Sequence, residues 1–315
     1  MTNLSRLGGN FSIPIPSDED GFTGRECPET ECEGYFKIEC GTGLKGENLP
    51  CYCPYCGYSG PHDKFWTKEQ IKYAKSVAMR KITKAIHKDF KKLEFEHKPR
   101  GAFGIGISMK FKPGRPIPIY RYQEKELETE IICENCTLRY AVYGIFAYCP
   151  DCGIHNSLQI LLTDFEVIKK QIVLAESQEA PLAEILIEDA LENCVSKFDG
   201  FGRNHCRSHK RKAKEPAKAE NISFQNISGA KGKLKKLFGV DITAGLAAED
   251  WDHVVLCFQK RHVFEHNKGV IDQAYVDKSG DPSAVVSRKL EIASSEVEEL
   301  VTILDRMANH INNKI

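Results

Sequence analysis

Paired cysteines in the first half of the chain have the types and spacing for metal chemistry. Cys133 and Cys136 form one CxxC pair, and Cys149 and Cys152 form a second pair after twelve intervening residues. Each CxxC turn presents two thiolates on one side of a tight knuckle, and four thiolates can close a tetrahedron around Zn²⁺. The intervening stretch is long enough for a β-hairpin that brings the knuckles together. The pattern predicts a structural zinc ribbon and disfavours a redox pair, because redox CxxC motifs do not come as spaced pairs.

A second and less regular cysteine cluster precedes the first. The sequence CPYCG at 53–57 echoes CPDCG at 149–153, which makes its two cysteines the preferred pair. The predicted ligands of this zinc site are Cys27, Cys32, Cys53 and Cys56. Cys51 could replace one of them, and we expect Cys40 to be a small buried apolar residue. Both zinc ions are expected to supply folding free energy, on the order of 10–16 kcal/mol each, and no catalysis.

Composition points to a cytoplasmic protein. The chain has 315 residues, a formal net charge of zero and 13 cysteines. An odd cysteine number and tight CxxC spacing favour metal ligation in a reducing compartment over a disulfide framework. The first ten residues lack the apolar core of a signal peptide, and no run approaches the roughly 18 apolar residues that span a bilayer. We therefore expect no membrane partner.

Positive charge gathers between the two cysteine clusters. Thr67 and Gln70 fit a capping box at the start of a helix. An apolar stripe follows at Ile71, Ala74, Ala78, Ile82, Ala85 and Phe90. The basic residues are Lys68, Lys72, Lys75, Arg80, Lys81, Lys84, Lys88, Lys91 and Lys92. Residues 104–122 read as strands around a Pro-Gly turn, with further basic and aromatic side chains. Such a surface can contact nucleic acid, and the alternative is a solvated helix with an ordinary hairpin.

The second half has the pattern of a helical bundle. We expect five helices and no strand after residue 157, with Pro181 at the first position of the second helix. Residues 206–220 are basic and lack apolar periodicity, which predicts a mobile loop. The last helix is expected after Asp281 and Pro282. Its apolar stripe comprises Val297, Leu300, Leu304, Met307 and Ile311. That stripe should pack against other helices or a second subunit.

A cationic cluster stands at the end of an otherwise apolar helical run, in the sequence RHVFEH at 261–266. Arg261 takes a place on an apolar stripe, where a buried guanidinium must meet an anion. His266 lies near the helix C-terminus, where the helix dipole favours an imidazolium. An arginine that holds charge beside a histidine that moves protons suits phosphate chemistry. Three other interpretations stay open: an Arg261–Glu265 helix salt bridge, core histidines, or a metal site at His262 and His266.

The stretch RHVFEHNKGVIDQAY resembles the HEPN ribonuclease domain. That family carries an arginine, usually followed by a polar residue, and then a histidine four to six residues further on. Here Arg261 is followed by His262 and, after four intervening residues, by His266. The trailing Asn267 and the preceding helix EDALENCVSKFDGFGRN are also similar to the family. The resemblance covers roughly residues 157–315, and the basic insertion near 207–218 departs from it.

The resemblance implies a metal-independent, dimeric endoribonuclease that acts as a toxin or as an effector in phage defence and stress. The Arg/His pairs of two subunits would meet at a dimer cleft, where the 2′-hydroxyl of RNA attacks the adjacent phosphorus. His266 would be the general base or acid, and Arg261 would stabilise the charged phosphorus centre. His262 and Asn267 would orient the phosphate or the His266 ring. Products would be a 2′,3′-cyclic phosphate and a 5′-hydroxyl.

The expected fold class is multidomain: two small β zinc ribbons with a connecting basic helix, then an all-α HEPN-like bundle. The expected segments are a first ribbon at 1–62, a basic helix at 63–100, strands and a second ribbon at 101–156, and the bundle at 157–315. The alternative function is a non-catalytic dimeric HEPN module whose ribbons bind nucleic acid, RNA or DNA, or a protein partner. On an ideal helix, Arg261 and His266 point about 140° apart, an objection that a two-fold arrangement of two chains relieves.

Overall fold

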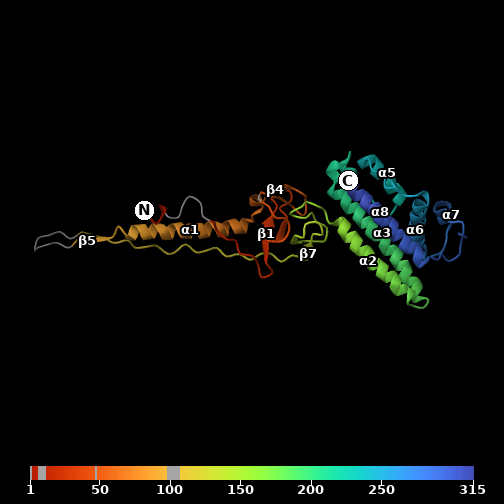
Figure 1. Ribbon diagram of the computed structural model, residues 1–315, viewed down its shortest axis with the longest axis horizontal. Coiled ribbons are helices and arrows are strands. Elements are labelled where there is room, and N and C mark those ends of the chain that lie inside the picture. The colour runs from red at the N-terminus through yellow and green to blue at the C-terminus, as the bar shows by residue number, and fades with distance from the viewer. Residues whose placement is uncertain (1, 6–11, 47, 98–106) are drawn as a thin grey trace, which may run out of the picture. The chain divides into compact units, whose positions relative to one another are not determined.

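The computed structural model describes residues 2–5, 12–46, 48–97 and 107–315, and Figure 1 shows its elements. The chain forms two compact units, Met1–Gly153 and Ile154–Ile315. The first unit holds both cysteine clusters and the basic helix. The second unit is helical. Part of the predicted strand segment, residues 104–106, lies outside the described residues.

One antiparallel sheet joins the two cysteine clusters of the first unit. Its strands, in spatial order, are β1 (Phe22–Glu26), β2 (Tyr35–Glu39), β8 (Arg139–Val142) and β7 (Thr129–Ile132). Because β2 pairs with β8, strands that flank different clusters share one core, which includes Phe36 and Tyr140. The hairpin expected between Cys136 and Cys149 is wrong. Only β8 lies there, and its hairpin partner β7 precedes Cys133.

The two knuckles dock against each other through reciprocal hydrogen bonds. The Tyr52 amide donates to the Pro150 carbonyl over 2.7 Å, and the Tyr148 amide donates to the Pro54 carbonyl over 2.9 Å. Tyr52 is the last residue of β3 (Pro50–Tyr52), which forms a small hairpin with β4 (Ser59–Pro61). A 3₁₀ turn at His62–Phe65 follows β4. The echoed sequences CPYCG and CPDCG therefore occupy equivalent places in one joint structure.

The basic helix α1 (Lys68–Lys91) begins at the predicted capping box. The Gln70 amide donates to the Thr67 hydroxyl, and the Thr67 amide donates to the Gln70 side chain, both over 3.1 Å. Only Gln70 and Ala85 are buried among the residues of α1. The apolar stripe is therefore mostly outside the core; Ile71 is 42% exposed and Phe90 is 48% exposed.

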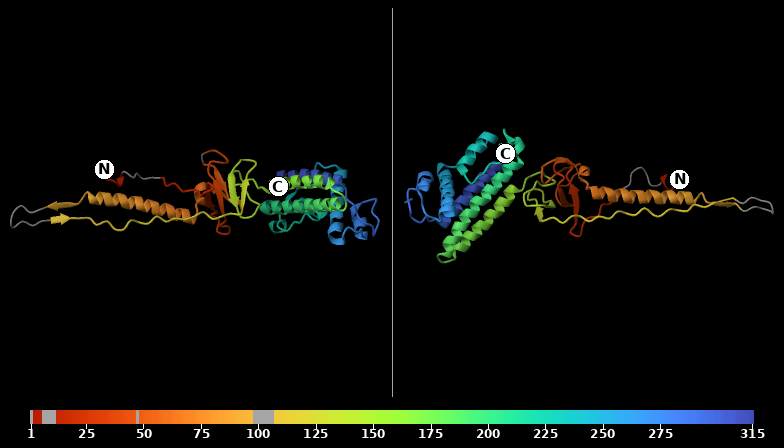
Figure 2. Two further views of the ribbon diagram at one scale, coloured as in Figure 1. Left: turned by 90° about the horizontal axis from the view of Figure 1, so that it is seen from below. Right: turned by 180° about the vertical axis from the view of Figure 1, so that it is seen from behind.

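The segment after α1 differs from the expected pair of strands. A short hairpin forms between β5 (Phe95–His97) and β6 (Ile107–Met109), but residues 110–128 contain no strand. Pro113, Pro116 and Pro118 lack the amide hydrogens that a strand ladder needs, so the expected strands around the Pro-Gly turn are wrong. The chain runs back alongside α1 instead, as Figures 1 and 2 show.

The second unit is a helical bundle without a strand in residues 154–315, all of which the structure describes. Its helices are α2 (Ser157–Glu176), α3 (Leu182–Ser208), α4 (Pro216–Ala219), α5 (Ile227–Phe238), α6 (Ala248–Asn267), α7 (Gln273–Ser279) and α8 (Ser294–Lys314). Helices α2, α3 and α8 pack side by side, and α6 packs on α3 and α8. The apolar stripe of α8 is buried in the core of its own chain.

Three expectations for the bundle are wrong in their boundaries. The stretch 206–220 is not a loop, because α3 continues to Ser208 and a 3₁₀ turn and α4 follow. Ala213 and Ala219 are buried there, which anchors the segment to the core. Helix α8 begins at Ser294, well after Pro282, because α7 and a run of turns occupy the intervening chain. Pro181 is the N-cap of α3 and not its first helical residue.

A cluster of histidines joins the start of α2 to the end of α3. His205 is 1% exposed, and its ring lies 4.4 Å from the ring of His209. The Ser157 hydroxyl lies 3.5 Å from Nδ1 of His205. Burial lowers the pKa of His205 to about 3 and the pKa of His155 to about 4. Both histidines are therefore neutral in the folded protein at neutral pH.

We predict that the bundle loses stability as pH falls below about 6.5. Below that pH, His205 and His155 bind protons in the unfolded chain but stay neutral in the folded protein. Each lowered pKa therefore reduces the free energy of unfolding by about 1.4 kcal/mol per pH unit, until the pH reaches the pKa of the folded state. Trp251 fluorescence, recorded in a Trp66→Phe background during urea unfolding, reports this unit. His205→Gln should flatten the pH dependence, because it removes one of the two histidines with a lowered pKa. Equal slopes for parent and His205→Gln would contradict the prediction.

Candidate metal centres and candidate active site

Two groups of four cysteines converge in the first unit. They are Cys27, Cys32, Cys53 and Cys56, and Cys133, Cys136, Cys149 and Cys152. In each group the sulfur atoms all lie within 4.8 Å of one another, and the closest pairs are 3.4 to 3.7 Å apart. A tetrahedron with metal–sulfur bonds of about 2.3 Å has edges of about 3.8 Å. A disulfide would need about 2.05 Å. Both quartets therefore fit a four-coordinate metal ion.

The backbone turns sharply after each of the three CxxC pairs, which places their sulfur atoms on one side. Gly57 and Gly153 adopt φ +70°, and Thr137 adopts φ 64°. The amide of each donates to the carbonyl of the first cysteine in its own pair, over 2.8 to 3.0 Å. Tyr148 covers Gly57, and Tyr52 covers Gly153, where an added Cβ would lie 2.9 Å from the ring. Glycine is needed at this second position for both its conformation and its size.

The donor set suits a structural ion. Burial raises the pKa of the Cys27 and Cys136 thiols to about 12, and it also raises the pKa values of Cys53 and Cys149. Such thiols stay protonated unless a cation takes the place of the protons. Four thiolates complete a tetrahedron and leave no position for substrate, so the sites contribute to folding and not to chemistry.

Two further cysteines of this unit lie outside the quartets. Cys51 is fully buried and belongs to neither group of converging sulfurs. Cys40 was expected to be buried, and this is wrong: it is exposed. The reason is its place directly after β2, where the chain leaves the sheet in a tight turn at Gly41 and Thr42.

The candidate active site lies at the C-terminal end of α6. Nη1 of the buried Arg261 lies 2.6 Å from Oε2 of Glu265, and Nε2 of His266 lies 3.5 Å from the same oxygen. The guanidinium and the imidazole thus approach the same carboxylate oxygen. The two side chains point about 140° apart on an ideal helix, and the Glu265 carboxylate lies between them and contacts both. The His266 side chain is 54% exposed, so the group that would move protons is open to solvent.

His262 completes a pair of rings at this helix end. Its ring meets the ring of His266 edge to face, with centroids 4.6 Å apart. The Arg261–Glu265 salt bridge weighed as an alternative is present. Arg261 Nε is buried and has no hydrogen-bond partner among the described residues. A metal at His262 and His266 lacks support, because only the cysteine quartets gather three or more metal ligands in the described chain.

Asn267 connects α6 to the next helix. Its side-chain amide donates to Asp272 over 2.7 Å, and Asp272 caps α7 by accepting from the Tyr275 amide over 2.8 Å. These hydrogen bonds lower the pKa of Asp272. Val263 and Tyr275 belong to a small apolar cluster that holds α7 against α6. Asn267 therefore fixes the helix end, and its predicted contact with a phosphate stays a prediction.

A cavity of about 430 Å³ opens beside His262. Gln259 and Lys278 line it, together with residues at the start of α5. Asp199 of α3 holds the chain that leads into α5. Its carboxylate accepts hydrogen bonds from the amides of Phe224 and Gln225 over 2.5 and 3.2 Å. Sequence reasoning missed this cavity because its walls form only when three consecutive helices, α5, α6 and α7, pack together.

Comparison with known proteins identifies no relative. No protein-family model, curated protein or solved structure matches the chain. None of the helices in the described ranges combines the length and apolar character required to cross a bilayer. A functional assignment therefore depends on the geometry of the chain itself.

We predict that the purified protein carries two zinc ions per chain, measured by plasma mass spectrometry. Cys149→Ser should remove at least one of them and lower the melting temperature of the first unit, because three thiolates leave an open coordination position. Cys40→Ser is the matched control, since its thiol is exposed and outside both quartets. Two zinc ions in the Cys149→Ser protein would show that this quartet does not bind the metal.

Proposed function

We propose that this protein is a homodimeric, metal-independent endoribonuclease with an active site of the HEPN type at the end of α6. Its cellular role would be that of a cytoplasmic toxin or defence effector. The observation that carries the proposal is the convergence of Arg261 and His266 on one oxygen of Glu265. Zinc would be structural in the two ribbons, which would recognise nucleic acid or a partner protein.

The proposed reaction needs only arginine and histidine side chains and the 2′-hydroxyl of the RNA itself. A histidine accepts the proton of the 2′-hydroxyl, whose oxygen bonds to phosphorus. The bond from phosphorus to the 5′-oxygen breaks, and that oxygen takes a proton from a histidine acid. Arg261 would bind the phosphoryl oxygens as negative charge develops, for which its planar fork is suited. The second chain would supply the second histidine across the two-fold axis.

Glu265 would hold the two groups in place when no RNA is bound. The Glu265 side chain is 34% exposed, whereas the Arg261 side chain is 10% exposed. The carboxylate can therefore turn to solvent while the guanidinium stays fixed, and a phosphate can take its place. Contact with His262 restricts the His266 ring. Lys278, across the neighbouring cavity, adds positive charge where the RNA backbone would continue.

A second candidate function is a dimeric HEPN-like module that does not cleave RNA. The Arg261–Glu265 pair favours it, since a partly buried i,i+4 ion pair can serve helix packing alone. In that case the ribbons would bind nucleic acid or protein, and the end of α6 would have no substrate.

We predict that the zinc-loaded protein cleaves RNA without added divalent metal and leaves DNA intact. His266→Ala and Arg261→Lys should each lower kcat/KM at least about 100-fold, because the first removes the proton carrier and the second removes the planar fork. Chromatographic analysis should find 2′,3′-cyclic phosphate ends. His310→Ala and Arg306→Ala are matched controls elsewhere in the bundle. Retained activity in both active-site variants, or none in the parent on any RNA, favours the non-catalytic module.

We predict that Glu265→Gln binds RNA several-fold more tightly in a His266→Ala background. The substitution removes the carboxylate that competes with phosphate for Arg261 and keeps the side-chain volume. Fluorescence anisotropy with labelled 2′-O-methyl RNA measures the affinity. A variant that loses stability with no gain in affinity would identify the Arg261–Glu265 pair as a packing interaction only.

A further inference from the structure

We infer that α1 and residues 110–122 form a binding surface for single-stranded nucleic acid, here termed the α1 groove. The groove has a volume of about 680 Å³, and it lies between the helix and the chain that returns alongside it. Phe111, Pro113 and Ile117 form its wall on the returning chain. This surface lies in the first unit, and the inference does not depend on the proposed nuclease.

Positive charge on this surface is concentrated and largely uncompensated. Helix α1 contains eight basic and two acidic residues, and residues 110–122 add four basic and no acidic ones. Arg80, Lys84, Lys88 and Lys91 line the groove. None of these four forms an ion pair with a described residue, in contrast to Lys72, which is paired with Glu69.

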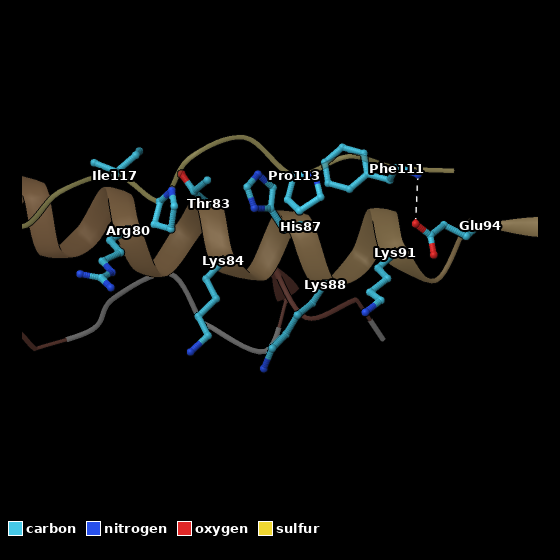
Figure 3. Close-up of a pocket in the computed structure, with 11 residues that line it drawn as sticks. Arg80, Thr83, Lys84, His87, Lys88, Lys91, Glu94, Phe111, Pro113 and Ile117 are labelled. Atoms are coloured by element: carbon cyan, nitrogen blue, oxygen red, sulfur yellow. Dashed lines mark hydrogen bonds between the residues drawn. The ribbon is translucent and has the colours of Figure 1, made fainter. Parts of the chain in front are cut away.

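The four basic residues share one face of the helix. Their spacing of four, four and three residues sets their side chains in a row, and Figure 3 shows them projecting from the same side of α1. At about 1.5 Å per residue the row extends about 17 Å. One strand of a stacked nucleic acid places a phosphate every 3.4 Å or so, so the row can follow about five phosphates.

Aromatic rings line the groove on the side of the returning chain, whereas the tips of the four basic side chains project from the other edge of α1 (Figure 3). Phe111 stacks on Phe90 with ring centroids 5.2 Å apart and lies 5.4 Å from the ring of His87. Phe90 is 48% exposed, and Tyr120, near the other end of the returning chain, is 42% exposed. Exposed rings beside a cationic track are the elements that bind single strands, because unpaired bases stack on them. An acidic peptide would match the charge but would leave the rings unused.

Packing against a core contributes little to the stability of this helix. Helix α1 buries only two of its 24 residues, so packing contributes little to it. Like charges at i,i+4 repel each other and destabilise a helix by about 0.2–0.5 kcal/mol per pair. The returning chain is fixed by specific bonds, in which the Phe111 amide donates to Glu94 and the Tyr120 amide donates to Ser76, over 3.0 and 2.9 Å. A bound polyanion would relieve this repulsion.

The test is RNA binding by the full zinc-loaded chain with His266→Ala, so that cleavage cannot affect the result. Fluorescence anisotropy with an unstructured 20-nucleotide RNA, over a range of salt concentrations, compares this protein with a variant in which Arg80, Lys84, Lys88 and Lys91 are glutamine. The matched control replaces Lys169, Lys197, Lys218 and Lys289, which form ion pairs in the second unit. Circular dichroism verifies that α1 stays helical.

The α1 variant should bind RNA at least about ten-fold more weakly. Its plot of log affinity against log salt should be less steep by about 3, because each lost phosphate contact reduces the steepness by roughly 0.7. Phe111→Ala should weaken binding with an unchanged salt slope. The control should stay within about three-fold of the parent. The inference is overturned if the α1 variant keeps the parent's affinity and slope, or if it loses binding only to polyglutamate. Neither result bears on cleavage.

Discussion

The candidate active site depends on a buried guanidinium that must have an anion. Arg261 occupies a core-facing place on α6, where an unpaired positive charge is strongly destabilising. In the structure, Glu265 supplies the anion, and the same carboxylate oxygen also contacts His266. A buried cation, a partly exposed carboxylate and an exposed imidazole thus share one helix end. The geometry suits a site in which a phosphate takes the place of a carboxylate.

Neighbouring residues hold that helix end in place. Asn267 and Asp272 fix the turn from α6 into α7, and Asp199 holds the start of α5 beside the cavity next to His262. In the first unit, a different constraint applies. The joint sheet is small and two groups of four cysteines converge in it, so a metal ion bound there would couple folding to metal binding. Helix α1 begins at a capping box beside this sheet and presents its charge to solvent.

Local signals in the sequence were sufficient for some of these features. The capping box at Thr67 and both cysteine quartets depend on short spacings, and the structure forms them as predicted. Features that depend on contacts between separate segments of the chain could not be predicted from the sequence. The pairing of β2 with β8 and the cavity beside His262 each join segments that no periodicity connects. The fold of 206–220 was missed because its anchors, Ala213 and Ala219, are isolated apolar residues in a basic run.

The central claim is that a phosphate binds between Arg261 and His266. A crystal structure of the zinc-loaded protein with RNA that carries a 2′-O-methyl group at the cleavage position tests it most directly. The account predicts a dimer in which a phosphate lies within hydrogen-bond distance of both side chains and Glu265 has turned away. A complex in which the Arg261–Glu265 pair stays intact and no phosphate approaches His266 would contradict it.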